Sequence, residues 1–302
     1  MSKIETRLKE VKTFEEQIDI LKDRNLIINN IDKALNILRN INYYRLSGYY
    51  TFFYIRDTND WKFNIGTTFE DIYELYCFDK ELRFILFGLT QSLEIMVRTH
   101  LAYEIAHKYG VDGWESVDLF FDYSESCNKK KINMCESYTK FRSNINQKIK
   151  RSEEIFIKHH QNNYDSKFPV WVVVETLDFG DLSKLYKNMK TIDKNHIARE
   201  YYNNNKYVYI ENWLEMSVIL RNICAHHGRV YGRKVFTIKK NKTMSKSNFN
   251  GLFALIIGIR EMMGESEDWH KFVDDMVCLS DRYTSIDFNK IDFPENWKDI
   301  LK

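Results

Sequence analysis

Apolar residues recur at intervals of three and four along much of this chain, which is the spacing of an amphipathic α-helix. The longest such pattern runs from Phe69 to Tyr109, where leucine, methionine, valine and isoleucine keep this spacing throughout. Thr68 precedes the pattern as a candidate N-cap, and Gly110 follows it as a candidate C-cap. The pattern therefore predicts one long helix over residues 69–109.

The same spacing predicts further helices on both sides of this segment. The polar, irregular stretches at residues 55–68 and 111–135 are expected to be loops, and short amphipathic pieces are expected at the C-terminus. The other expected helices cover residues 14–25, 29–41, 136–160, 211–229 and 246–264.

The segment KFPVWVVVETLDFGDLSKLYKNM (residues 167–189) has two interpretations. Its WVVV run could be a buried strand. However, Pro169 suits the first position of a helix and the apolar run continues without alternation, which favours a short buried helix. We expect a break at Phe179-Gly180 and a second helix capped by Asp181, with Trp171 and Phe179 in the core.

Composition supports an all-α fold. The 302 residues include 11 Gly and 2 Pro, well below the typical shares of about 7% and 5%. The apolar fraction of 44% is enough for a sizeable core. No linker marks a second domain firmly, so we expect one compact helical domain over residues 61–302, with a helical extension over residues 1–60 packed on it.

Several features predict a cytoplasmic protein without membrane association. The first residues lack the apolar region of a signal peptide, and no uninterrupted apolar stretch approaches the roughly 18 residues of a membrane-spanning helix. An odd number of cysteines without a CxxC motif favours reduced thiols, although Cys127 and Cys135 could form a bridge. The five cysteines are Cys77, Cys127, Cys135, Cys224 and Cys278.

The charge distribution is compatible with an anionic partner but does not require one. Net charge is only +2, and basic residues gather in several clusters; one such cluster is usually a solvated face, and several together are compatible with an anionic partner. The adjacent His159 and His160 have no Cys or acidic partners at ligand spacing, so no metal or cofactor is expected. The basic clusters are residues 129–131, 147–151, 228–234 and 239–242.

The segment LRNICAHHGRVYGR (residues 220–233) gathers imidazole and guanidinium groups after an apolar run. At about 100° per residue, His227 shares a helix face with Ile223 and Cys224, so it is expected to be packed or hydrogen-bonded. His226 lies on the other, polar face and is expected to be the chemically available imidazole. That polar face consists of Arg221, Asn222, His226 and Arg229.

This polar face has the groups needed to cleave RNA without a metal. An imidazole can transfer protons near neutral pH, and an arginine fork can stabilise a phosphorane. Asn222 would orient the phosphate or the histidine. No cluster of carboxylates accompanies the segment, which argues against a two-metal nuclease. The alternative is structural, because His and Arg in a last helical turn, with Gly228 as C-cap, can simply cap carbonyl groups.

Other residues are candidates for supporting roles. Glu94 and Arg98 are an i,i+4 pair that either orients Arg221 or His226 or is an ordinary surface ion pair. The aromatic residues between Tyr43 and Phe53 could stack on bases, although core packing is favoured. Candidate RNA contacts are Arg229, Arg233 and Lys234.

Arg221-Asn222-x-x-x-His226 resembles the R-x4-H form of the signature of HEPN-domain ribonucleases, and His227 also satisfies an x5 spacing. Together with three further blocks, the segment resembles, in order, the abortive-infection Abi family of the AbiD/AbiF type. These blocks are NYYRLSGYYTFFY (42–54), SLEIMVRTHLAYEIAHKYG (92–110) and FPVWVVVETLDFGDLSKLY (168–186), and with the motif they are distributed over residues 40–235.

The resemblance implies a HEPN-like helical bundle and a toxin-like endoribonuclease in bacterial anti-phage defence, akin to the nuclease domains of RNA-guided CRISPR effectors. It implies Arg221, Asn222 and His226 as catalytic residues, control by a small RNA antitoxin, and a site completed by a second copy in a homodimer or RNA-bridged oligomer. Two alternatives stay open: a non-catalytic module that binds a structured regulatory RNA, and a purely structural helical protein.

Overall fold

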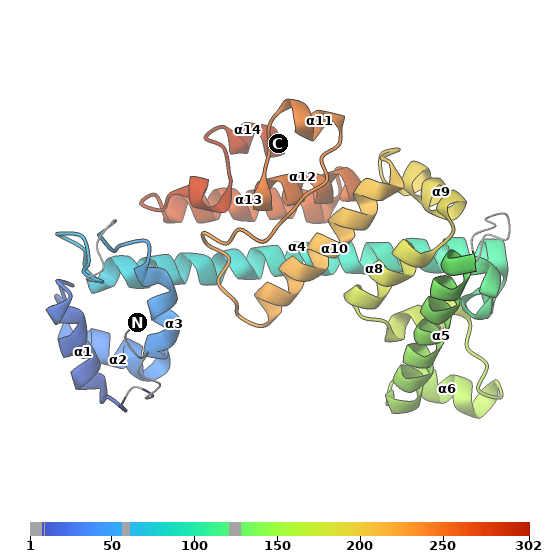
Figure 1. Cartoon of the computed structure of the whole chain (residues 1–302), viewed down its shortest axis with the longest axis horizontal. Coiled ribbons are helices and arrows are strands. Elements are labelled where there is room, and N and C mark those ends of the chain that lie inside the picture. Colours follow the sequence, from blue (N-terminus) through green and yellow to red (C-terminus); the bar gives the residue numbers. More distant parts are fainter. Residues whose placement is uncertain (1–7, 9, 56–60, 121–127) are drawn as a thin grey trace. The chain divides into compact units, whose positions relative to one another are not determined.

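The computed structural model describes residues 8, 10–55, 61–120 and 128–302, without the side chains of residues 128–135 and 137. Every regular element in these ranges is helical, and two isolated β-bridges, Ile27–Thr68 and Tyr54–Phe63, are the only strand-like pairings described there. The all-α prediction is therefore confirmed (Figure 1).

The chain divides into two compact units. The first consists of residues 1–82 and 279–286, and the second of residues 83–278 and 287–302. The expected extension over residues 1–60 falls within the first unit, and its packing on a core formed by residues 61–302 stays a prediction.

Short capped helices build the first unit. They are α1 (Phe14–Asp23), α2 (Ile31–Asn40) and α3 (Tyr43–Tyr50). Of the aromatic residues on α3, Tyr49 and Tyr50 are buried, and the Tyr49 hydroxyl donates to Asp79 Oδ2 (2.6 Å). Core packing, rather than base stacking, thus accounts for these two rings.

Helix α4 (Phe69–Tyr109) has the predicted bounds. At its start Thr68 Oγ1 accepts a hydrogen bond from the Asp71 N–H (3.1 Å), while Asp71 Oδ2 accepts one from the Thr68 N–H (2.8 Å). This reciprocal capping box satisfies two backbone donors. At its end Gly110 adopts φ +90°, a left-handed conformation that glycine adopts without a Cβ penalty.

The second unit contains the rest of α4 and most of the other helices. α10 packs against α8, α9 and α12, and nearly every residue of α12 is buried. Besides part of α4, the second unit contains α5 (Asn128–Arg151), α6 (Ile155–Asn163), α7 (Val170–Val173), α8 (Phe179–Asn188), α9 (Thr191–Tyr201), α10 (Tyr207–Ala225), α11 (Lys242–Lys246), α12 (Gly251–Met263), α13 (Glu267–Arg282) and α14 (Trp297–Leu301). The last residues of α13 belong to the first unit.

The structure corrects the single helix expected over residues 136–160. Two helices, α5 and α6, occupy this region, because Ser152 Oγ accepts the Glu154 N–H (3.3 Å) in a local turn that interrupts the ladder. α5 also begins within the expected loop over residues 111–135, whose residues 121–127 lie outside the described ones. The Cys127/Cys135 pair is likewise outside the description, whereas the described cysteines Cys77, Cys224 and Cys278 are not in disulfides.

The short buried helix expected after Pro169 is present as α7, but the break that follows lies earlier than predicted. Asp178, not Asp181, is the N-cap of α8, because Asp178 Oδ1 accepts the Asp181 N–H (3.0 Å) and Asp181 Oδ2 accepts the Asp178 N–H (3.3 Å). Phe179 is buried as expected, whereas Trp171 is 52% exposed. A single helical turn can bury only one side, and the valines of α7 occupy it.

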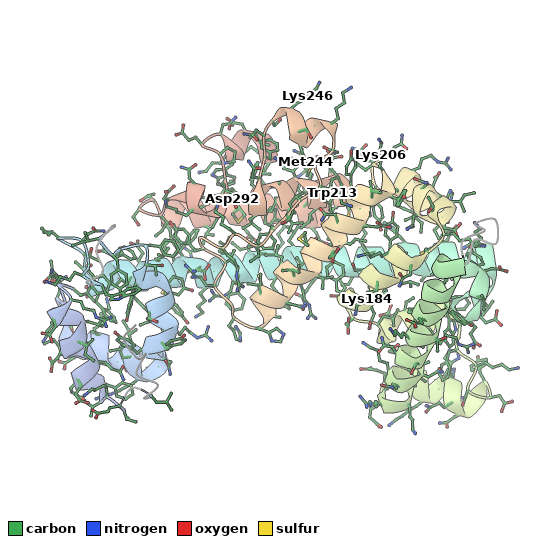
Figure 2. All side chains as sticks on the ribbon, in the orientation of Figure 1. Lys184, Lys206, Trp213, Met244, Lys246 and Asp292 are labelled. Carbon is green, nitrogen blue, oxygen red and sulfur yellow. The ribbon has the colours of Figure 1, made fainter. Side chains whose placement is uncertain are left out.

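At Gly258, α12 lies directly against Trp213 of α10 (Trp213 is labelled in Figure 2). A Cβ at Gly258 would lie 2.8 Å from Trp213 Cδ2, and Trp213 is fully buried. Gly258→Ala should therefore destabilise the protein by about 1–3 kcal/mol through overpacking. Gly88→Ala on α4, where nothing lies within 4 Å of the new Cβ, should instead stabilise it by roughly 0.5–1 kcal/mol. Urea unfolding checks the difference, and equal midpoints for the two variants would contradict it.

Candidate functional site

The helix that carries Arg221 and Asn222 ends at Ala225 in a specific turn. His226 is its C-cap (φ −91°, ψ 16°). The His227 N–H donates to the Cys224 carbonyl (3.1 Å) and the Gly228 N–H donates to the Ile223 carbonyl (2.7 Å). This pair of bonds is a Schellman motif, in which the residue after the C-cap is left-handed.

His227 is that left-handed residue, with φ +57°. Glycine usually takes this position, and a residue with a Cβ costs roughly 1–2 kcal/mol there. Such strain is stored mainly at functional sites. The segment thus places a histidine at a strained position where the backbone leaves the helix.

This ending corrects the helix expected over residues 211–229. The helical wheel does not apply beyond Ala225, so His226, His227 and Arg229 do not extend the faces of α10. His226 and His227 are both exposed. The expectation that His227 is packed or hydrogen-bonded stays a prediction. The left-handed position belongs to His227, not to Gly228.

Arg221 has three described neighbours, which bias the orientation of its guanidinium. Its Nε lies 3.9 Å from Glu94 Oε2, its Nη1 donates to Asn222 Oδ1 (3.3 Å), and its guanidinium lies over the Phe87 ring, 5.9 Å from the centroid. The side chain remains 32% exposed. An anion can therefore still reach an arginine whose orientation is already set.

Glu94 contacts both Arg221 and a second arginine, Arg98. Arg98 Nη2 donates to Glu94 Oε1 (3.0 Å) and to the Leu177 carbonyl (2.8 Å), and Arg98 Nη1 donates to Glu175 Oε2 (3.1 Å). Burial raises the pKa of the Glu94 carboxyl, and the charges of Arg98 and Arg221 oppose this rise.

The Glu94 side chain is only 13% exposed and contacts Arg221, so the Glu94–Arg98 pair is more than a surface ion pair. Glu94 contacts Arg221, whereas no described contact joins the Glu94–Arg98 pair to His226. Glu175 and the Leu177 carbonyl are members of this network that the sequence analysis missed, and no local pattern could have linked them to α4.

The loop after the motif returns to the site. A Cβ on Gly228 would lie 3.4 Å from Arg233 Nη1, so the Arg233 guanidinium lies beside the Schellman turn. Lys234 instead forms an ion pair with Asp292, whose Oδ2 accepts the Leu252 N–H (3.2 Å) at the start of α12 (Asp292 is labelled in Figure 2). Of the expected RNA contacts, Arg233 is thus near the motif, and Lys234 already has a carboxylate partner.

A model of the family described as Abi-like protein matches residues 36–232. The chain belongs to the Abi-like family. The predicted resemblance to the Abi family is confirmed, and the match includes Glu94, Arg98 and the segment from Arg221 to Gly232. Membership of this family suggests a role in abortive-infection defence. No curated protein and no solved structure matches the chain.

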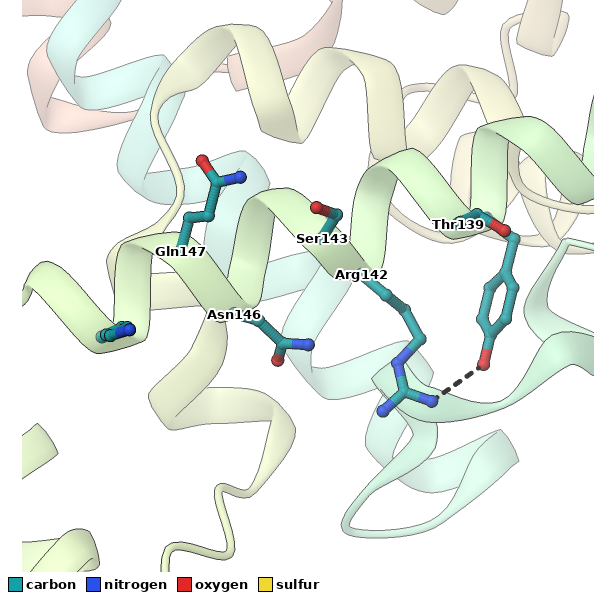
Figure 3. A pocket seen from close by; sticks show the side chains of 7 residues that line it. Thr139, Arg142, Ser143, Asn146 and Gln147 are labelled. Carbon is teal, nitrogen blue, oxygen red and sulfur yellow. Dashed lines mark hydrogen bonds between the residues drawn. The ribbon is translucent and has the colours of Figure 1, made fainter.

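The Abi-like chain has a second polar surface on α5 (Figure 3). A cavity of about 470 Å³ runs along this helix, where Arg142 donates to the Tyr138 hydroxyl (3.2 Å) and to Glu115 Oε2 (2.7 Å), and lies over the Trp114 ring. The cluster at residues 147–151 is partly neutralised, because Lys148 pairs with Asp178 and Asp181. Hydroxyl, amide and cationic groups line the cavity: Tyr138, Thr139, Arg142, Ser143, Asn146, Gln147 and Lys150.

In the part of the Abi-like chain that the structure describes, no three His, Cys, Asp or Glu side chains are grouped so that they could hold a metal ion. Among the same residues, no helix combines the length and the apolar character needed to cross a membrane.

Proposed function

We propose that this Abi-like chain is a metal-independent endoribonuclease of abortive-infection defence, with Arg221, Asn222 and His226 in its active site. One observation carries the proposal: an exposed imidazole follows directly on the helix that holds a pre-oriented, accessible arginine. Pre-oriented charge is what stabilises a transition state, because it need not reorganise during the reaction.

In the proposed reaction, His226 transfers protons between the ribose 2′-hydroxyl and the leaving 5′-oxygen. The 2′-oxygen attacks the phosphorus, the bond to the 5′-oxygen breaks, and a 2′,3′-cyclic phosphate forms. Arg221 stabilises the negative charge on the phosphorane. Asn222 accepts a hydrogen bond from Arg221 Nη1 and so helps to orient the guanidinium.

The chain holds one R-x4-H sequence, and the reaction needs both a base and an acid. We propose that a second copy of the chain supplies the other imidazole in a homodimer or an RNA-bridged oligomer. His227, which is also exposed, is the alternative within one chain. We also propose that the site belongs to a HEPN-like bundle and that a small RNA antitoxin restrains it.

Incubation of the purified protein with total RNA in excess EDTA tests this function. Cleavage products that carry 2′,3′-cyclic phosphate ends are expected, because the mechanism uses the neighbouring 2′-hydroxyl and no metal. A matching 2′-deoxy substrate should stay intact. Absence of cleavage at every ratio of protein to RNA would contradict the proposal.

The second candidate is a non-catalytic module that binds a structured regulatory RNA. The observation in its favour is that Arg221 already pairs with Glu94 while Arg233 lies beside the motif, as in a surface that holds phosphates without reacting. Intact, defined RNA that co-purifies with the protein, without cleavage of any added RNA, would favour this candidate.

A further inference from the structure

A separate cavity of about 590 Å³ lies between the C-terminal part of α4 and helix α9. In Figure 1, α9 lies beside this end of α4. Neither the proposed reaction nor the sequence motif uses any of its lining residues. The polar side chains that matter here are Glu104, His107, Lys108, Asp193, His196 and Arg199.

Arg199 is oriented by a chain of hydrogen bonds. Its Nη2 lies 3.2 Å from His196 Nδ1, and His196 Nε2 lies 3.1 Å from Glu104 Oε2. Since a guanidinium can only donate, His196 Nδ1 accepts and Nε2 carries the proton that it donates to Glu104. The Tyr201 hydroxyl donates to the other carboxylate oxygen of Glu104 (2.7 Å). Both carboxylate oxygens of Glu104 therefore already accept a hydrogen bond, one from Tyr201 and one from His196. His196 in turn orients Arg199.

His107 also lines the cavity. Its Nδ1 donates to the Tyr103 carbonyl (2.8 Å), and its ring packs on the Tyr103 ring, with centroids 3.9 Å apart. This bond fixes the tautomer and leaves Nε2 as the remaining polar atom. A phosphate group that still carries a proton can donate to it, and a protonated ring can donate to a phosphate oxygen.

The remaining charged pair of the cavity combines a buried carboxylate with a half-exposed lysine. Asp193, whose side chain is 6% exposed, pairs with Lys108, whose side chain is 49% exposed, and also accepts from the Tyr109 hydroxyl. Both carboxylates that line the cavity are thus mostly buried and already bonded, while the Lys108 and Arg199 side chains are 49% and 62% exposed. The Arg199 Nε also pairs with Glu200 Oε1 (3.4 Å) outside the lining, which leaves Nη1 and Nη2 of its fork for a ligand.

From this geometry we propose that the cavity binds a phosphate monoester, as carried by a nucleotide or by the 5′ end of a nucleic acid. A phosphate monoester offers about two negative charges and three acceptor oxygens. These match the Arg199 fork, the Lys108 ammonium and the His107 imidazole. The volume lies within the range of small-ligand sites, roughly 300–1,000 Å³.

Calorimetric titration of the full chain with inorganic phosphate, AMP and adenosine tests the site. AMP and phosphate should bind and adenosine should not. Arg199→Ala should weaken AMP binding by about tenfold or more, because it removes a charged hydrogen-bonding group. Arg199→Lys should restore only part of the affinity, since it keeps the charge without the fork. Arg39→Ala, on α2 and outside the cavity lining, should bind as wild type does.

A second comparison separates the two sources of the phosphate. Short 2′-deoxyoligonucleotides with a 5′-phosphate or a 5′-hydroxyl cannot react through a 2′-oxygen, so their binding does not depend on the proposed nuclease. Tighter binding of the phosphorylated strand, lost in Arg199→Ala, would assign the cavity to nucleic-acid ends; AMP binding without this preference would assign it to free nucleotides. Failure of AMP and phosphate to bind at millimolar concentration, or wild-type AMP affinity in Arg199→Ala, would overturn the proposal.

Discussion

Replacement of His226 by alanine should slow RNA cleavage by about 10²–10⁴-fold, because it removes the group that transfers the proton in the transition state. Little change in stability is expected, since His226 is exposed and its cap role uses backbone atoms. The single-turnover rate in EDTA measures the chemical step, and the affinity for a 2′-deoxy substrate should change little.

His227→Gly is the matched control. It removes the neighbouring imidazole and places glycine at the left-handed position, so it should raise the free energy of unfolding by roughly 1 kcal/mol. Cleavage should persist in this variant if His226 is the reactive imidazole. Loss of cleavage in His227→Gly with full activity in His226→Ala would reverse the two roles.

The Arg221→Lys variant should lower the cleavage rate by about 10²–10³-fold, the usual effect of losing one donor that stabilises a transition-state oxyanion. Lysine keeps the positive charge but not the fork, so ground-state RNA binding should fall much less than the rate. The fold should survive, because Glu94 retains its 3.0 Å contact with Arg98. Circular dichroism checks the fold, and single-turnover kinetics with a separate binding titration check the two effects.

Asn222→Ala tests whether Arg221 acts as an oriented group. Loss of the 3.3 Å bond to Nη1 should lower the rate less than Arg221→Lys does. In the double variant the two effects should not add, because Asn222 acts through Arg221. Additive losses would give Asn222 a contact of its own with the substrate.

Local signals in the sequence were enough to predict both ends of α4. Thr68 and Gly110 bound α4 as predicted, since a capping box and a left-handed glycine need no distant partner. The same reasoning named the wrong N-cap at α8, where two aspartates lie three residues apart. Both belong to its capping box, and only the backbone conformation shows that Asp178 is the cap.

The family and the all-α class were likewise accessible, because ordered blocks and helical periodicity are properties of the sequence alone. The position of the motif was predicted correctly, but its backbone conformation was not. A helical wheel assumes that the helix continues through the motif. In the structure the helix ends at Ala225 in a Schellman motif, with His227 at the left-handed position where glycine is usual.

Sequence patterns alone located helices α4, α10 and α12, the caps of α4 and the positions of Arg221, Asn222 and His226. What surrounds these residues depends on how the helices pack. Arg98 reaches Glu175 across 77 residues of sequence, and Glu94 on α4 meets Arg221 on α10. Such contacts depend on how helices pack, and packing is fixed by the fit of whole helix faces, which no short motif encodes.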